Sequence, residues 1–149
     1  MMTARKYAAI LVSLALAATI TFPAQGQTRL PNPVLYLTAI EPYSVGGVEM
    51  VRYEYDVANK AEYPAEMFVI SPALPPCGTN TRSSRSWVDI FNMLGRRLYG
   101  FCALGSPQDL GKIWFALPAY EVPPSWVYIE ITDRKANVKY KSNLADTVQ

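Results

Sequence analysis

The sequence predicts an all-β fold: an antiparallel two-sheet sandwich of seven or eight strands with one disulfide. Three observations lead to this prediction. Runs of β-branched and aromatic residues are short, and Pro, Gly and Asn separate them. Several runs alternate apolar and polar residues with a period of two, which is typical of strands that bury a single side. No segment after residue 26 has the spacing of an amphipathic helix.

Residues 1–26 are interpreted as a secretory signal peptide. Two basic residues come first, residues 8–22 are small or apolar apart from three hydroxyl side chains, and Pro23 ends the run. Small residues around the expected cut favour cleavage after Gly26. The run is shorter than the roughly 20 residues of a membrane-spanning helix, and an uncleaved anchor is the alternative. We therefore expect a periplasmic or secreted protein with no stable membrane span after cleavage.

Cleavage would also change the charge of the chain. The full sequence has 14 Lys and Arg against 12 Asp and Glu. The signal segment contains two of the basic residues and no acidic one, so the remaining chain is neutral. A neutral domain has no net field for attracting nucleic acid, and we expect no nucleic-acid partner. Residues 27–149 are predicted to form one sandwich domain with an ordered core over about 32–143.

Three strands are predicted in the first half of this domain, over residues 34–40, 48–59 and 66–70. Pro42 and the Gly46–Gly47 pair separate the first strand from the second. Residues 71–86 are rich in Pro and polar residues and are predicted to form an ordered loop. The second strand alternates most clearly, with one face made of Val51, Tyr53, Tyr55 and Val57.

A hairpin is predicted from residues 87–92 and 96–104. Its three-residue loop ends at Gly95, which fills a left-handed position without strain. This loop would pair Ile90 with Leu98. In the same register Val88 faces Gly100 and Asp89 faces Tyr99. A further strand is predicted over residues 112–117.

The last hairpin is predicted from residues 126–132 and 138–142, with a turn over 134–137. An even-length turn places Ile131 opposite Tyr140 on the inner face and Glu130 opposite Lys141 on the outer face. Both pairs are favourable, and a slip of one residue would lose both. Residues after 143 are predicted to fray.

The order of these elements resembles the immunoglobulin-like and fibronectin type III-like sandwiches. The most similar piece is the proline corner at Pro123–Pro124, followed by a strand containing Val127, Ile129 and Ile131 and a closing hairpin. The resemblance covers about residues 32–143 and implies a two-sheet sandwich. Such folds have many unrelated functions, so the resemblance implies no particular activity.

Cys77 and Cys102 are the only cysteines. In an exported protein such a pair usually forms one bridge, and two buried thiols are the alternative. The bridge would stabilise the fold by roughly 3–4 kcal/mol in a chain-entropy estimate.

The sequence contains no His, which excludes a Ser-His-Asp triad and histidine-ligated zinc. We expect no cofactor, no metal and no enzymatic activity. Asp56, Asp89 and Glu130 are interpreted as solvated strand carboxylates. The basic residues near the middle hairpin are interpreted as loop charges, with a patch for an anionic glycan or lipid headgroup as the alternative: Arg82, Arg85, Arg96 and Arg97.

The predicted register gives the middle hairpin two apolar faces, although a sandwich sheet needs only one. Either residues 72–80 cover the second face or it binds a ligand. We therefore expect an exported binding or adhesion module that recognises a protein or glycan. The alternatives are an assembly accessory of the cell envelope and a small hydrolase or its inhibitor. The candidate binding residues are Trp87, Phe91, Tyr99 and Phe101, with Asp89 and Arg97 as polar contacts.

Overall fold

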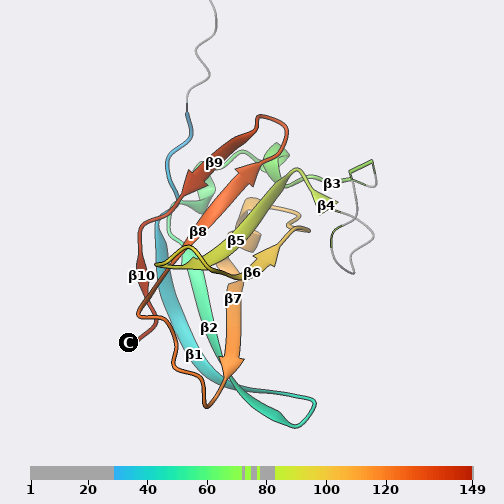
Figure 1. Cartoon of the computed structure of the whole chain (residues 1–149). Helices are drawn as coiled ribbons and strands as arrows, with labels where there is room; N and C mark the ends of the chain where they lie inside the picture. The colour runs from blue at the N-terminus through green and yellow to red at the C-terminus, as the bar shows by residue number, and fades with distance from the viewer. Residues whose placement is uncertain (1–28, 72, 75–76, 78–82, 149) are drawn as a thin grey trace, which may run out of the picture.

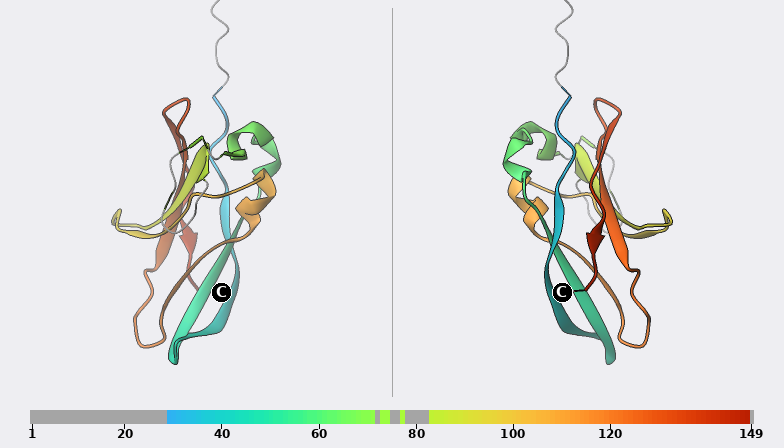
Figure 2. Two further views of the ribbon diagram at one scale, coloured as in Figure 1. Left: turned by 90° about the vertical axis from the view of Figure 1, so that its right-hand side faces the viewer. Right: turned by 90° about the vertical axis from the view of Figure 1, so that its left-hand side faces the viewer.

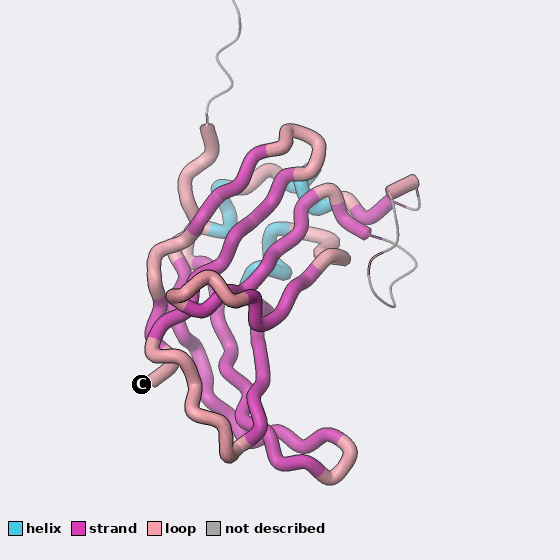
Figure 3. Tube along the Cα trace, viewed as in Figure 1, coloured by secondary structure: helices cyan, strands magenta, loops and turns pink. Residues whose placement is uncertain are grey.

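A computed structural model describes residues 29–71, 73–74, 77 and 83–148, and strands dominate it (Figures 1 and 3). The predicted signal segment therefore lies outside the described residues. In chain order the elements are β1 (Leu35–Val45), β2 (Val48–Val57), η1 (Lys60–Glu62), η2 (Ala65–Phe68), β3 (Ile70–Ser71), β4 (Ser83–Ser84), β5 (Ser86–Asn92), β6 (Arg97–Phe101), η3 (Pro107–Gly111), β7 (Ile113–Pro118), β8 (Trp126–Asp133), β9 (Val138–Lys141) and β10 (Ala145–Asp146).

Two antiparallel sheets contain the main strands. The smaller sheet has the order β1-β2-β7. In the larger sheet β5 lies between β6 and β8, and the other edge of β8 pairs with β10 near its start and β9 near its end. Figure 2 shows the sheets edge-on, facing each other. β3 and β4 form a separate two-stranded ribbon.

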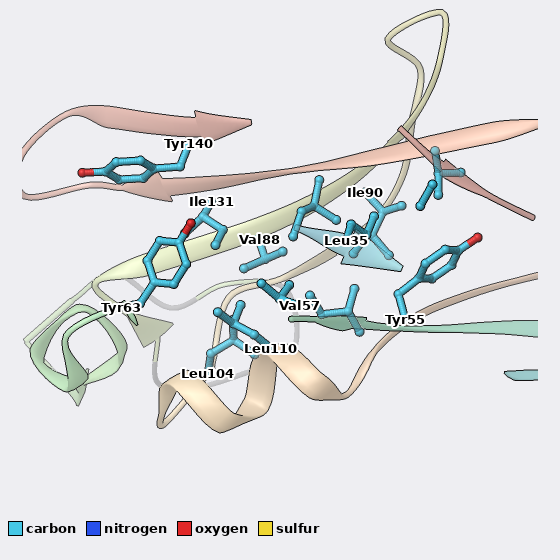
Figure 4. Packing of buried hydrophobic residues seen from close by; sticks show 14 of the residues in the cluster. Leu35, Tyr55, Val57, Tyr63, Val88, Ile90, Leu104, Leu110, Ile131 and Tyr140 are labelled. Carbon is cyan, nitrogen blue, oxygen red and sulfur yellow. The ribbon is translucent and has the colours of Figure 1, made fainter. Parts of the chain in front are cut away.

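Alternating residues of both sheets form one apolar core (Figure 4). The predicted inner face of the second strand is confirmed, since Tyr53, Tyr55 and Val57 are buried and Val51 packs against them. The larger sheet and β7 contribute a second set of buried side chains: Val88, Ile90, Ile113, Phe115, Val127, Ile129 and Ile131.

The first hairpin is longer than predicted, because β1 continues through Pro42 to Val45. β1 pairs only with β2, so it is an edge strand of its sheet, where a residue without an N–H is tolerated. The turn lies at Gly46 and Gly47, whose φ angles of 57° and 82° favour glycine.

The strand predicted over residues 66–70 is wrong for most of its length. Residues 65–68 form the 3₁₀ turn η2, which follows Pro64. Met67 and Phe68 are both buried. Consecutive residues of a strand point to opposite faces, so a strand covered on one side could not bury both of them. The two-residue strand β3 follows.

The loop of the middle hairpin is confirmed, but its register is wrong. Gly95 has a φ of 81°, and Asn92 donates its N–H to the carbonyl of Arg96 at 2.9 Å. Phe91 lies opposite Arg97 as predicted, and a β-bulge then shifts the pairing by one residue. The observed pairs are Ile90 with Tyr99, Asp89 with Gly100 and Val88 with Phe101.

The last hairpin has the predicted register, with Ile131 opposite Tyr140 and Glu130 opposite Lys141. The segment after residue 143 does not fray as predicted. Its strand β10 pairs with the start of β8, and the Tyr55 hydroxyl donates to the Asp146 carbonyl at 3.2 Å. Buried Ala145 belongs to the core, and this packing holds the end of the chain in place.

Candidate functional site

The outer face of the larger sheet brings together four of the six predicted binding residues. Trp87, Asp89 and Phe91 alternate along β5 with the buried residues of the core, so they point away from the smaller sheet. Arg97 joins them, because its Nε donates to the Asp89 carboxylate at 2.6 Å. These four side chains form one row along β5.

Strand β8 adds a second row beside the first. Trp87 lies opposite Thr132, Asp89 opposite Glu130 and Phe91 opposite Tyr128. The Phe91 and Tyr128 rings stack with centroids 5.3 Å apart and planes 17° apart. Tyr128 is only 7% exposed although it lies on an outer face, so its neighbours on this face cover it.

Two cations lie on the rings of this face. The Arg134 guanidinium, in the turn between β8 and β9, lies 4.3 Å from the centre of the Trp87 ring. The Lys141 ammonium lies 3.9 Å from the centre of the Tyr128 ring. Both distances are within the range of cation–π attraction. Cations therefore cover at least part of the surface for which segment 72–80 and a bound ligand were the two alternatives. Most of that segment lies outside the described residues.

Two further cations neutralise a pair of facing carboxylates. Asp89 and Glu130 lie directly opposite each other, which is unfavourable for like charges. Arg97 pairs with Asp89, and Lys139 pairs with Glu130 at 3.0 Å. This close contact with the Glu130 carboxylate raises the pKa of Lys139. We call the whole set the cation–aromatic face: Trp87, Asp89, Phe91, Arg97, Tyr128, Glu130, Arg134, Lys139 and Lys141.

Gly100 makes room for one of these ion pairs. It lies opposite Asp89, and a Cβ at this position would collide with the Arg97 guanidinium and the Asp89 carboxylate. The side chain of Arg97 therefore crosses β6 in space that the missing side chain of residue 100 leaves free.

The turn between β5 and β6 rises at one end of the face. Figure 2 shows this turn projecting from the larger sheet on the side away from the smaller sheet. Gly95 in the turn lies beside Tyr128. A Cβ built on Gly95 would be 3.9 Å from the Tyr128 hydroxyl oxygen. Leu94 at the tip is 85% exposed. The face is thus bounded at the Tyr128 end and bordered by Arg134 at the Trp87 end.

The basic patch considered from the sequence does not form as one group. Arg85 makes a paired hydrogen bond with Asp133. Arg96 lies 3.8 Å from Glu121, and Arg97 is engaged by Asp89. Arg82 lies outside the described residues. The cations of the face instead come largely from the last hairpin.

Tyr99 and Phe101 do not lie on this face. The bulge turns them toward the inner side of the larger sheet, where their rings lie 5.1 Å apart. Tyr99 also stacks on Trp114 of β7 at 5.3 Å, and Trp114 meets the Tyr43 ring at 6.0 Å. These rings lie between the β6 edge of the larger sheet and the β7 edge of the smaller one, and Tyr99 remains 42% exposed.

Sequence reasoning missed Tyr128, Arg134, Lys139 and Lys141 as members of the face. The alternation of the last hairpin does place Tyr128 and Glu130 outward. The missing information is that β8 pairs with β5 in the sheet. Along the chain, β6 and β7 come between these two strands. No turn connects these two strands directly, so local patterns could not reveal the pairing.

No three carboxylate or cysteine side chains of the described ranges are grouped so that they could hold a metal ion. Within the same ranges, no helix is long and apolar enough to cross a membrane. The chain matches no known protein-family model, no curated protein and no solved structure.

Proposed function

We propose that this chain is an exported, non-catalytic binding module with a fibronectin type III-like sandwich, and that its cation–aromatic face binds a glycan outside the cytoplasm. The observation that carries this proposal is a single rigid sheet face with the Trp87 ring toward one end and the stacked Phe91 and Tyr128 rings toward the other.

The order of the strands supports the fold assignment. In the described part of the chain, seven strands have four residues or more: β1, β2, β5, β6, β7, β8 and β9. The first, second and fifth of these share one sheet, and the third, sixth and seventh share the other, as in immunoglobulin-type sandwiches. The fourth, β6, pairs with the third, which is the arrangement of fibronectin type III domains.

The disulfide between Cys77 and Cys102 supports export. Such bonds persist in oxidising compartments outside the cytoplasm. Together with the signal-like segment at residues 1–26, this favours a periplasmic or secreted protein.

Aromatic rings fixed on strands suit the apolar faces of sugars, and neighbouring charged groups supply hydrogen bonds to their hydroxyls. Asp89 and Glu130 are two facing carboxylates, as in a catalytic pair. Each of them, however, already forms an ion pair with a basic side chain. The face therefore offers groups for recognition, and we propose binding without turnover.

The test compares two aromatic truncations in the mature protein. We expect Trp87→Ala to weaken binding in a glycan array and in calorimetry by about tenfold or more, since burying one large apolar side chain against a ligand contributes ~1.5–3 kcal/mol. Tyr99→Ala is the matched control, because Tyr99 is exposed but lies off the face. Equal losses of affinity in the two variants would contradict the assignment of the binding site to the cation–aromatic face. Binding to a protein and to no glycan would overturn the ligand assignment.

A further inference from the structure

We propose that the cation–aromatic face selects anionic glycans, whose carboxylate or sulfate groups bind Arg134 and Lys141 while the sugar rings lie on the aromatic side chains. This inference rests on the proposed function and adds the chemistry of the ligand.

The charge balance of the face favours an anion. It has four cations, Arg97, Arg134, Lys139 and Lys141, against the two carboxylates Asp89 and Glu130. Arg97 and Lys139 are used in ion pairs. Among the described residues, no carboxylate lies within 4.0 Å of the Arg134 or Lys141 charge. Arg134 Nη1 donates to the Ser83 hydroxyl at 3.5 Å, and this neutral partner does not cancel its charge. The face therefore has two positive charges that no carboxylate of the described residues neutralises.

The opposite outer face has the reverse balance. On the smaller sheet and the adjoining η1, Arg52 contacts both Glu41 and Glu54, and Lys60 contacts Asp56. Three carboxylates there face two cations. The chain after residue 26 is neutral overall, so its charge is separated between its two sides. Such a separation orients a polyanion toward the larger sheet.

The position of the two cations explains why neutral sugars would be disfavoured. Arg134 and Lys141 lie on the ring faces that a sugar would need. A cation over a ring is held less strongly than a cation in a charge-assisted hydrogen bond. An anionic group can therefore draw the cation off the ring and free the ring for stacking. A neutral sugar has no charge with which to do so.

The Trp87 indole gives a second indication that a ligand can replace Arg134 on this ring. Its indole N–H is buried and has no hydrogen-bond partner among the described residues. Arg134 lies over the same ring. Movement of Arg134 toward a ligand would open this donor to a sugar hydroxyl, which would remove the cost of an unmet donor.

The spacing of the rings predicts the size of the ligand. Trp87 and Phe91 are four residues apart on one strand, which corresponds to about 13 Å at roughly 3.3 Å per residue. Arg134 lies at the Trp87 end, and Lys141 lies at the end of the Phe91–Tyr128 stack. A ligand that meets both cations must carry anionic groups on separate sugar units, so we expect an oligosaccharide to bind better than a single sugar.

The experiment uses the mature chain and four probes: oligogalacturonate, dextran sulfate, neutral maltohexaose and inorganic polyphosphate. We expect oligogalacturonate or dextran sulfate to bind about tenfold or more tighter than maltohexaose and polyphosphate, by a difference of about 1.4 kcal/mol. The first two probes separate a carboxylate ligand from a sulfate ligand. Binding should quench or shift tryptophan fluorescence as Arg134 leaves the ring, and Trp87→Phe should abolish that signal.

Three charge variants complete the test. Arg134→Gln and Lys141→Gln should each weaken anionic binding about tenfold and reduce the salt dependence by about one charge. Lys112→Gln is the control, since Lys112 is 78% exposed and lies off the face. Melting temperatures check that each variant is folded.

The outcomes separate this inference from the proposed function. Equal or tighter binding of maltohexaose, still sensitive to Trp87→Ala, would overturn the anionic selectivity and leave a glycan module. Equal binding of polyphosphate would show a charged surface with no use of the rings. Unchanged affinity in both Arg134→Gln and Lys141→Gln would also overturn the inference. Failure of all sugar probes would overturn the proposed function as well.

Discussion

At the scale of single residues, Asp133 holds one end of the larger sheet. Its carboxylate accepts a hydrogen bond from Arg85 Nε at 2.8 Å and from the backbone N–H of Lys135 at 3.0 Å and of Ala136 at 3.2 Å. Its side chain is 4% exposed. Burial by itself raises the pKa of Asp133, but the hydrogen bonds from Arg85 and the two amides outweigh it and lower the pKa below the usual 3.8.

Replacing the Asp133 carboxylate should make the free energy of unfolding less dependent on pH in the acidic range. We expect Asp133→Asn to cost about 3 kcal/mol near neutral pH, because the variant leaves Arg85 without its buried partner. The folded pKa lies below the unfolded one, so the stabilisation is complete above the unfolded value and is lost as pH falls through the folded value. Urea unfolding at about pH 7, 5 and 3 should show the two proteins converging toward the lowest pH. A difference that stays constant with pH would contradict this account.

At the scale of elements, the β5–β6 hairpin combines a loop set by local chemistry with a bulge that local chemistry does not reveal. Asn92 supports the loop twice, since its side-chain oxygen accepts the N–H of Leu94 at 3.1 Å and of Arg96 at 2.8 Å. The bulge then rotates the rest of β6. As a result Gly100, and no aromatic residue, lies beneath the Asp89–Arg97 pair.

The loop can be tested at Gly95. Gly95→Val should destabilise the protein by about 1–2 kcal/mol, because a β-branched residue resists the left-handed backbone at φ 81°. The added Cβ would meet the Tyr128 hydroxyl only at an ordinary contact distance of 3.9 Å, so strain is the cause. Leu94→Val at the exposed tip is the control and should change stability by less than about 0.5 kcal/mol. If thermal unfolding gives both variants the same stability, the turn has another conformation in solution.

At the scale of the whole molecule, the disulfide ties the β3–β4 region to the edge of the larger sheet. Cys77 precedes β4, Cys102 follows β6, and the two Cα atoms are 6.3 Å apart. The bond joins residues 25 positions apart, so it limits the unfolded chain more than it strengthens a local turn.

Removing this bond should lower stability without changing the sheets. We expect a Cys77→Ala/Cys102→Ala variant to lose about 3 kcal/mol in urea unfolding, from the loss of the constraint on the unfolded state. Reduced wild-type protein should match the double variant, and a reducing agent should leave the double variant unaffected. Equal stability of the oxidised and reduced wild-type protein would contradict the prediction.

The sequence by itself determined the β class, the inner face of β2, the loop at Gly95 and the register of the last hairpin. Each depends on residues close together in the chain. A period of two identifies which side of a strand is buried, and the length of a turn sets the pairing of the strands that it joins. The same local information placed Trp87, Asp89 and Phe91 on one side of β5.

Only the tertiary structure decided the rest of the candidate site. The pairing of β5 with β8 brings Tyr128, Arg134 and Lys141 beside Trp87, and the two strands have no turn in common. The bulge in β6 moves Tyr99 and Phe101 to the other side. β10 is ordered because it joins β8 and the core. These contacts join residues distant in the chain, and their stability comes from burial against partners that no local pattern specifies.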